Sequence, residues 1–446
     1  MDRETLKKQV CAAIDQRRER IVALGEAIMD DPELGFKEVR TARRVAEIFA
    51  ELQLPFEEGL ALTGVKAQLA GRRPGPTVAL MGELDALVVP GHPRAHAQTG
   101  AAHACGHNAQ IAGLMGAALG LAACRAADHL TGQIAFMAVP AEEYVEIDYR
   151  LGLVQERKAT FLGGKAEMLE RGHFDGVDMA LMIHSGSAEH LEGAVGVAAS
   201  SNGFLAKSVR FIGRAAHAGM APEQGINALK AAQIALVAID AQRETFRDQD
   251  CVRVHPILTK GGDLVNIVPA EARLETYVRA RTNEAMLDAA AKVDRALRGA
   301  AMALGCQVEI QTIPGYLSLR NDPLLAQVFR ENAGQLFGSA AYRDLPHSGG
   351  STDAGDLSQL MPVLHPVMMG ASGAAHSTGW HISDPDSGYL APAKALAMMA
   401  IDLLWDDASL ARRVAHEHQP ALSKEAYLRQ QKAVFNTELY AGEGGG

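Results

Sequence analysis

The stretch HACGHNAQIAGLMGAALGLAAC, residues 103–124, decides how this chain of 446 residues is interpreted. It begins with two histidines on either side of Cys105 and continues into a run of Ala, Leu, Ile and Gly that carries no charge. We expect residues 108–124 to form an apolar helix with Cys105 and His107 at its start. Thiolate and imidazole groups are ligands that zinc and related transition metals accept. The stretch therefore predicts a metal site at the beginning of a helix.

Segments typical of strands and helices alternate around this stretch. The predicted buried strands of the first half are residues 77–81, 133–139 and 177–183. Buried strands that alternate with helices indicate an α/β domain with a mainly parallel sheet. Polar residues follow each of these strands, namely Glu83 and Asp85, then Glu142 and Glu143, then His184. Because ligands of open α/β sheets bind at the carboxyl ends of the strands, we expect these residues at one edge of the sheet.

The pattern changes near Gly196. The following segments predict the order strand, helix, strand, strand, helix, strand: residues 204–212, 222–245, 252–259, 272–281, 283–304 and 307–313. This order is typical of a ferredoxin-like α+β module. The first pattern then resumes with a helix at 323–337, a strand at 363–369 and a helix from Pro392. We therefore predict a catalytic α/β domain in two parts, residues 1–195 and 317–446, interrupted by a smaller domain at 196–316. A glycine-rich tail at 442–446 is expected to be disordered.

The composition narrows the class of protein. Hydrophobic residues make up 48% of the chain and charged residues 22%, which is enough to build a large core. The formal net charge of -10 argues against a nucleic-acid partner, since phosphate binding requires a basic surface. Five cysteines, an odd number, indicate a reducing compartment rather than a disulfide framework. The charged N-terminal segment does not resemble a signal peptide, and the longest apolar run, residues 111–124, is too short to span a bilayer, so we expect a cytoplasmic protein with no membrane partner.

A catalytic metal site requires ligands from separate loops, and the sequence offers several. Glu142 and Glu143 are adjacent at a strand end, so one could bind a metal while the other acts as general base; a solvated turn is the simpler alternative. His184 and His376 are further candidates, although each could be a hydrogen-bonded structural histidine. His381 is an alternative to His376 as a metal ligand. His103 is interpreted as structural.

Five motifs together resemble a known family. They are GELDAL at 82–87, HACGHN at 103–108, the pair Glu142 and Glu143, GRAAHAG at 213–219 and GSTD at 350–353. In order and spacing they resemble the aminoacylase/carboxypeptidase-G family of cocatalytic metallopeptidases, over about residues 10–405. The thiol-containing motif resembles the amidohydrolase branch, which includes indole-acetyl-amino-acid, hippurate and aminobenzoyl-glutamate hydrolases. The resemblance implies a mainly parallel α/β catalytic domain and a ferredoxin-like lid that also serves for dimerisation.

The resemblance also implies roles for individual residues. The implied metal ligands are Cys105, His107, Glu143, His184 and His376. They would hold one or two divalent ions, Mn or Zn. Glu142 is implied as the general base, and Asp85 as a carboxylate that orients a ligand. The implied reaction is cleavage of the amide bond of an N-acyl amino acid, with an aromatic acyl group, or of a dipeptide by a metal-activated water.

In the lid, the resemblance implies three more functional residues. His217 would reach the active site of a partner subunit and stabilise the oxyanion there. Asn266 and Arg279 would bind the carboxylate of a small-molecule substrate, a role that suits the bidentate geometry of a guanidinium. These assignments predict a homodimer or a larger homo-oligomer.

Two departures from the family keep other functions open. Residues 144–150, YVEIDYR, stand where family members often have glycines, and Asn108 stands where many have Asp. The bulky segment could narrow the pocket beside the general base. One alternative is hydrolytic removal of an amino group from an aromatic ring, as in nitroanthranilate aminohydrolase. The other is a metal-binding subunit without catalytic activity.

Overall fold

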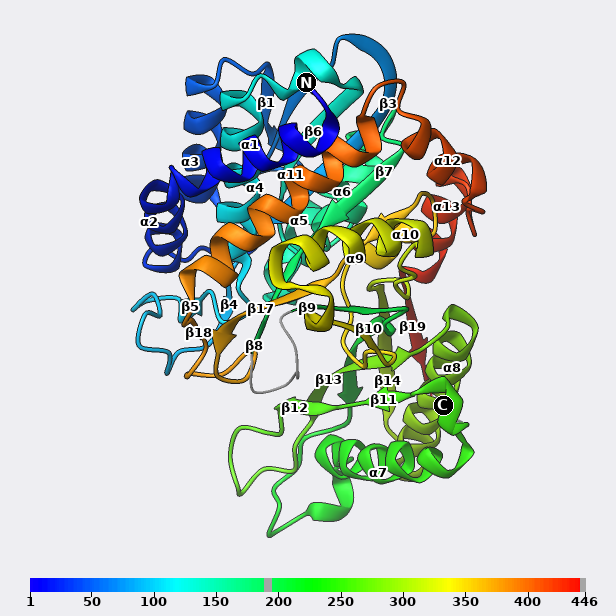
Figure 1. Cartoon of the computed structure of the whole chain (residues 1–446). Coiled ribbons are helices and arrows are strands. Elements are labelled where there is room, and N and C mark those ends of the chain that lie inside the picture. The colour runs from blue at the N-terminus through cyan, green and yellow to red at the C-terminus, as the bar shows by residue number, and fades with distance from the viewer. Residues whose placement is uncertain (188–194, 442–446) are drawn as a thin grey trace. The chain divides into compact units, whose positions relative to one another are not determined.

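The computed structural model describes residues 1–187 and 195–441, and its internal contacts divide the chain into two compact units (Figure 1). The first unit comprises residues 1–199, 320–346 and 356–423. The second unit comprises residues 200–319, 347–355 and 424–446. The glycine-rich tail predicted at 442–446 lies outside the described residues.

The main sheet of the first unit is mostly parallel, which confirms the predicted α/β class. Its strand order is β1 (Phe56–Leu60), β2 (Gly64–Ala70), β6 (Thr131–Val139), β3 (Arg73–Glu83), β7 (Met179–Met182) and β16 (Val363–Leu364). The last four strands run parallel, whereas β1 and β2 are antiparallel additions at one edge. Strand β3 is buried from residue 76 to residue 83, as expected for a central strand covered on both faces.

The predicted apolar helix is α4 (His107–Ala123), and it lies inside the first unit. It packs on β3 and is covered by α1 (Arg3–Asp15), α2 (Arg18–Met29) and α11 (Ala391–Leu404) (Figure 1). Gly116 makes the close approach to α11 possible, because a Cβ atom there would lie 2.8 Å from Cβ of Ala393. Small residues in α4 therefore allow three helices to pack tightly behind the strand ends.

Further helices and a second sheet complete the first unit. The remaining helices of at least seven residues are α3 (Val39–Glu51), α5 (Ile147–Gln155), α6 (Gly164–Glu170), α9 (Pro323–Phe337) and α12 (Ser409–Glu417). The second sheet contains β15 (Tyr342–Leu345), β9 (Val195–Ala198), β17 (Val367–Ser372), β18 (His381–Ile382) and β8 (His184–Ser187). The strand predicted at 177–183 is β7, and β8, which follows it from His184, belongs to this second sheet.

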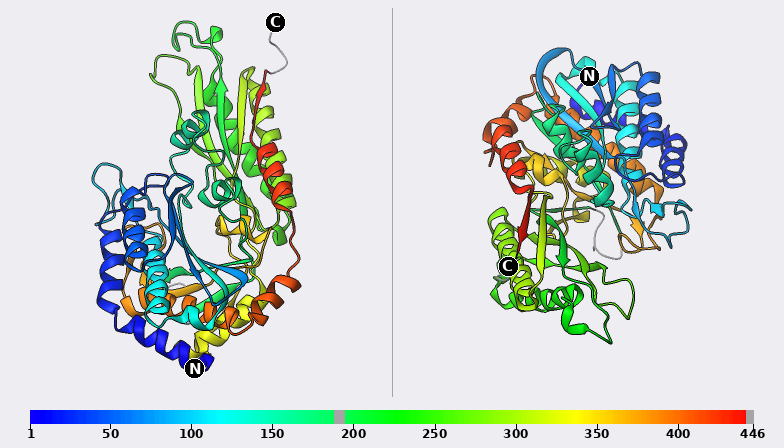
Figure 2. Two further views of the ribbon diagram at one scale, coloured as in Figure 1. Left: turned by 90° about the horizontal axis from the view of Figure 1, so that it is seen from above. Right: turned by 180° about the vertical axis from the view of Figure 1, so that it is seen from behind.

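The second unit has one antiparallel sheet with two helices against it. Its strands are β11 (Arg253–Val254), β12 (Ile257–Lys260), β13 (Glu271–Ala280), β10 (Gly203–Ile212), β14 (Gln307–Pro314) and β19 (Asn436–Tyr440). Helices α7 (Ala228–Ala241) and α8 (Asn283–Leu304) pack on each other and on this sheet (Figure 2). The elements follow the predicted β-α-β-β-α-β order.

Three details differ from the sequence predictions. The helix predicted at 222–245 begins only at Ala228, where the side chain of Asn227 accepts a hydrogen bond from the amide of Lys230. The strand predicted at 252–259 is interrupted and forms β11 and β12. Residues 424–446 were assigned to the catalytic domain, but the helix α13 (Lys424–Val434) packs on β14, and β19 pairs with it. Because β14 and β19 are far apart in the sequence, their pairing leaves no local sequence pattern that would predict it.

Among the described residues, none of the helices combines the length and apolar character that crossing a bilayer requires.

Candidate metal centre

The loop that begins α4 places Cys105 and His107 next to each other. Gly106 precedes the helix with φ of 87°, a left-handed conformation that favours glycine. A Cβ atom at this position would lie 2.7 Å from Cβ of Ser185, so the residue also has no room for a side chain. The amide of His376 donates to the carbonyl of Ala104 at 2.7 Å. This hydrogen bond joins the loop that carries His376 to the loop that carries Cys105. His376 itself has φ of 62°, an uncommon conformation for this residue type.

Cys105 belongs to two groups of side chains that could each hold an ion. In one group, ligand atoms of Cys105, His107 and His184 all lie within 4.8 Å of one another. In the other, Cys105, Glu143 and His376 do so. The distance from Cys105 Sγ to His184 Nε2 is 3.4 Å, and that from His376 Nε2 to Glu143 Oε1 is 3.3 Å. The structure thus brings together all five residues predicted as ligands, with one sulfur shared between two sets.

Asp85 contacts one residue of each ligand group. Its Oδ2 accepts a hydrogen bond from the amide of Glu143 at 2.8 Å, and its carbonyl oxygen lies 2.9 Å from His107 Nδ1. The carboxylate and His107 Nδ1 are also 3.3 Å apart, so Asp85 directs the Nε2 atom of His107 away from itself. This is the arrangement by which a buried carboxylate fixes the orientation and tautomer of a histidine ligand.

The electrostatics of the thiol suit a metal ligand. Burial and the charge of Glu143 oppose ionisation of Cys105, but the neighbouring His184 and His107 outweigh them and lower the pKa of the thiol to about 6. Hydrogen bonds that His376 donates to Cys105 and Glu143 raise the pKa of its imidazole to about 10. Burial opposes ionisation of Glu143 as well, yet the hydrogen bond from His376 holds its pKa below the usual value. Thiolate, carboxylate and imidazole form a donor set that a borderline transition metal binds.

The hydrogen bonding of the buried atoms tests whether a metal ion fits these ligand groups. His107 Nε2 is buried and forms no hydrogen bond, although Glu83 Oε2 lies 3.1 Å away. A buried nitrogen without a partner is costly, and coordination of an ion would satisfy it. The residues present therefore fit one or two divalent ions.

Glu83 and Lys165 form a buried ion pair beside this histidine that the sequence did not reveal. Lys165 Nζ lies 2.6 Å from Glu83 Oε1, and Gln110 Nε2 donates to Oε2 at 2.6 Å. Both charged side chains are almost completely buried. The charges of Lys165 and His107 overcome the effect of burial and keep the pKa of Glu83 low. The position of Glu83 after a strand was a signal for the site, but nothing in the sequence around Lys165 indicated its partner.

The segment at 144–150 supports the glutamate pair. Arg150 is buried and donates to the carbonyl oxygens of Leu162, at 2.7 Å, and Glu143. Its guanidinium also lies 5.4 Å from the ring centre of Phe36 and 5.9 Å from that of Tyr144. Tyr144, Ile147 and Arg150 of this segment are therefore buried, whereas Tyr149 is exposed, and Arg150 holds the loop that carries Glu142 and Glu143.

The side chain of Asn108 has a structural role in the core. It is fully buried, and its Nδ2 donates to the carbonyl of Gly25 at 3.1 Å and to the hydroxyl of Tyr389 at 3.2 Å.

His381 is not part of either ligand group. It is exposed, and its ring nitrogen lies 3.0 Å from the carbonyl oxygen of Gly379. Between the two histidines considered for one role, the geometry favours His376.

The remaining predicted residues, His217, Asn266 and Arg279, belong to the second unit. His217 and Ile267 form an isolated bridge, and the amide of Ala218 donates to the carbonyl of Asn266 at 2.9 Å, so His217 and Asn266 lie on adjacent segments. Arg279 lies on β13 and donates to the hydroxyl of Ser351 at 3.1 Å. None of the three is part of the groups described for the first unit.

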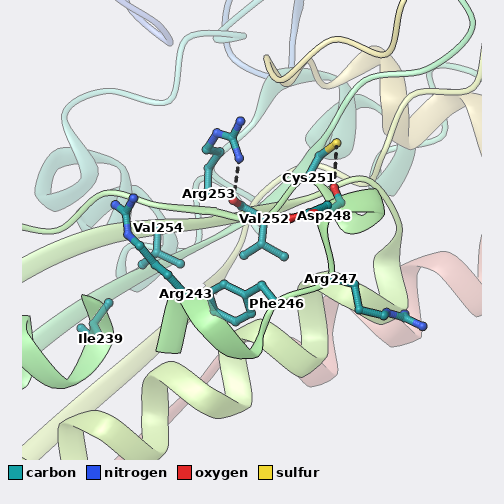
Figure 3. Close-up of a pocket in the computed structure, with 9 residues that line it drawn as sticks. All are labelled: Ile239, Arg243, Phe246, Arg247, Asp248, Cys251, Val252, Arg253 and Val254. Carbon is teal, nitrogen blue, oxygen red and sulfur yellow. Dashed lines mark hydrogen bonds between the residues drawn. The ribbon is translucent and has the colours of Figure 1, made fainter. Parts of the chain in front are cut away.

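A separate pocket of about 340 Å³ also lies in the second unit (Figure 3). Its lining residues are Ile239, Arg243, Phe246, Arg247, Asp248, Cys251, Val252, Arg253 and Val254. It contains none of the predicted site residues.

Comparison with known proteins places these features in context. A model of the peptidase family M20/M25/M40 matches residues 79–400. Xaa-Arg dipeptidase from Mus musculus is 30% identical over 445 residues, which cover 95% of each chain. Indole-3-acetyl-aspartic acid hydrolase from Enterobacter agglomerans is 31% identical and covers 67% of this chain and 66% of its own. The crystal structure of a dinuclear metal binding peptidase of this family from Bacillus subtilis superposes with a TM-score of 0.66, at 23% identity, over 87% of this chain and 99% of its own.

Proposed function

Since the chain belongs to peptidase family M20/M25/M40 and is a metal-dependent amidohydrolase, we propose that it releases an amino acid from an N-acyl amino acid or a dipeptide, with Glu142 as general base. The observation that carries this proposal is the thiolate of Cys105 shared by two groups of ligands. The proposed ligands are Cys105, His107, His184, Glu143 and His376. An aromatic acyl group is the favoured substrate class, on the likeness to the indole-3-acetyl-aspartic acid hydrolase.

The chain's own residues account for the steps of hydrolysis. A bound divalent ion supplies Lewis acidity and lowers the pKa of water. Glu142 lies in a group with Glu83 and His107, next to Glu143, and it is buried. In this position Glu142 accepts a proton from the attacking water and passes it to the leaving amine. Asp85 and Arg150 keep the side chains and the loop in place during the reaction.

Manganese or zinc is proposed as the native ion. The imidazole and carboxylate donors suit both metals, whereas the thiolate favours zinc. Metal analysis of the purified protein, followed by activity measurements after removal and return of each ion, distinguishes the two.

The active form is proposed to be a homodimer with His217 acting on the site of the partner subunit. Apolar side chains stand exposed on the second unit, including Met220 at 83%, Val237 at 68% and Leu264 at 62%. We propose that they contribute to the subunit interface, since a contiguous exposed apolar patch marks a site of protein association. A cytoplasmic location belongs to the same proposal, because all five cysteines are free thiols.

Two assays test the function. The metal-loaded protein is incubated with N-acetyl and N-benzoyl amino acids and with dipeptides, and released amino acid is measured by mass spectrometry alongside released ammonia. Amino acid release supports the proposal. Ammonia without amino acid would contradict it and favour deamination of an aromatic amine.

The cross-subunit role of His217 has its own test. Glu142→Gln and His217→Ala are each expected to be nearly inactive. When they are mixed and allowed to exchange subunits, a heterodimer contains one site with both residues intact. Activity should then return to about a quarter of the wild-type level, because half of the dimers are mixed and each has one complete site. No recovery despite proven exchange contradicts the proposal.

A further inference from the structure

Glu38 is a fully buried carboxylate at the position just before α3 in the first unit. Helix α3 packs on β1 and β2 (Figure 1). A carboxylate at this position commonly accepts hydrogen bonds from the first amides of its helix, but Glu38 forms no such bond. Glu33 takes that role, because its Oε2 accepts from the amides of Arg40 and Thr41, each at 2.9 Å. The carboxylate of Glu38 is therefore directed elsewhere.

Both oxygens of Glu38 bind segments outside its own helix. Oε1 accepts from the amide of Ala141 at 2.8 Å, and Oε2 accepts from the hydroxyl of Thr63 at 2.6 Å. Burial and, next, the charge of Asp85 raise the pKa of Glu38 to about 7. Because Ala141 directly precedes Glu142 in the sequence, Glu38 holds the beginning of the segment that carries the proposed general base.

Ala141 has a backbone conformation that alanine rarely adopts. Its φ is 51°, in the left-handed region, where the Cβ atom of an L-residue is crowded by its own backbone. A residue retains such a conformation only when its surroundings hold it there. Here the amide donates to Glu38, and the carbonyl accepts from the amide of Gly164 at 3.1 Å. The directions of Glu142 and Glu143, the next two residues, depend on this conformation.

We propose that Glu38 is a positioning residue of the hydrolysis, whose hydrogen bond keeps Ala141 left-handed and thereby directs Glu142 and Glu143 towards the metal groups. The inference rests on the proposed function, in which Glu142 is the general base and Glu143 a ligand. In the present conformation Glu142 belongs to a group with His107 whose ligand atoms lie within 4.8 Å of one another. A rotation about φ of Ala141 would move both carboxylates, and a displacement of about 1 Å at a reacting group can cost on the order of 10²-fold in rate.

Steady-state kinetics of Glu38 variants test the proposal. Glu38→Met keeps the length of the side chain but removes both acceptors, so we expect kcat to decrease by about 10–100-fold with little change in KM. Glu38→Gln retains an oxygen for the amide of Ala141, and its kcat should exceed that of Glu38→Met by at least about threefold. Glu33→Met is the matched control, since it removes a buried carboxylate of the same loop that binds the amides of α3. It should lower the free energy of unfolding without lowering kcat.

A double variant separates the backbone conformation from general stability. Glycine adopts the left-handed conformation without strain, so it depends less on the hydrogen bond from Glu38. The kcat of Glu38→Met/Ala141→Gly should therefore exceed that of Glu38→Met by at least about threefold. Glycine lowers the stability of most folded segments, so a purely structural role of Glu38 predicts no recovery.

Metal affinity gives a readout that does not depend on turnover. Because Glu143 is a proposed ligand on the same segment, Glu38→Met should weaken binding of the ion by about tenfold in competition with a chelator, whereas Glu33→Met should not. If Glu38→Met does not fold, Thr63→Val serves instead, because it removes one partner of Glu38 with little change in shape. Its kcat and metal affinity should each decrease by at least about threefold.

Several results would overturn this inference while leaving the amidohydrolase function intact. They are a wild-type kcat in Glu38→Met, equal losses of kcat in Glu38→Met and Glu33→Met, no recovery in both Glu38→Gln and the double variant, or unchanged kcat and affinity in Thr63→Val. If the metal-loaded wild type releases no amino acid from any substrate, the proposed function itself fails. The metal affinities then decide the positioning role alone, and an unchanged affinity in Glu38→Met overturns it.

Discussion

The metal groups of the first unit and the arginines of the second differ in how their charges are balanced. Around Cys105 each buried charge has a partner in the protein, such as Lys165 for Glu83 and His376 for Glu143. In the second unit, the exposed Arg253 donates to the carbonyl of Val252 and forms no ion pair with a carboxylate of the described residues. The first region therefore pairs its buried charges within the protein, whereas solvent balances the charge of an exposed arginine such as Arg253. The following predictions probe this difference, from the largest expected effect to the smallest.

Glu142→Gln should have the largest effect on turnover. Loss of a general base typically reduces the rate by about 10²–10⁴-fold, and the amide keeps the size of the side chain. The decrease should appear in kcat, with the metal content unchanged in elemental analysis. A kcat close to wild type with full metal occupancy would show that Glu142 is not the base.

Lys165→Met tests whether the first region is balanced internally. The substitution leaves Glu83 buried without its partner, and breaking a buried ion pair costs about 3–5 kcal/mol. Denaturant unfolding should show a loss of this size in the free energy of unfolding. The double variant Glu83→Gln/Lys165→Met should recover most of the loss, because no buried charge remains. Equal destabilisation of the single and double variants would mean that packing, rather than charge, dominates.

Arg150→Met should loosen the loop of Glu142 and Glu143. Without the guanidinium, the carbonyls of Glu143 and Leu162 lose their donor, and residues that hold ligands in place typically contribute about 10–100-fold to metal affinity. Competition with a chelator measures the affinity. Arg43→Met, which removes an exposed arginine paired with Glu47 at 3.0 Å, is the control and should bind metal normally. Unchanged affinity in Arg150→Met would limit Arg150 to a role in folding.

The dependence of metal affinity on pH should have two ranges. The pKa of His376 is raised to about 10, and the pKa values of His107 and His184 are raised as well, so at neutral pH the ion must displace at least one proton and affinity should rise by at least about tenfold per pH unit. The pKa of Cys105 is lowered to about 6, so the thiol also becomes protonated below that pH and the slope should steepen. His376→Asn should flatten the upper range, as measured by chelator competition from pH 5 to 9. A pH-independent affinity between 6 and 9 in the wild type would contradict the assigned state of His376.

The sequence predicted the parts of the site that depend on local pattern. Glu142 and His184 follow strands, and the edge of a parallel sheet brings such residues together, so their neighbourhood could be predicted. Lys165 could not be predicted, since it meets Glu83 only after distant segments pack. The role of Arg150 could not be predicted either, because its partners are backbone carbonyls, which every residue type provides. The inserted unit was predicted from its order of elements, but β19 was not, because an edge strand is defined by pairing rather than by periodicity.

The position of β19 in the chain has a consequence for biosynthesis. Strand β14 ends at Pro314, and among the described residues its outer edge pairs with residues 436–440 of β19. At synthesis rates of about 5–20 residues per second, that edge emerges from the ribosome on the order of ten seconds before its partner strand. During this interval its backbone donors and acceptors are open to any other extended chain, which is the situation that leads to aggregation. A nascent chain of this protein is therefore most in need of a chaperone during the interval before the final strand emerges and completes the sheet.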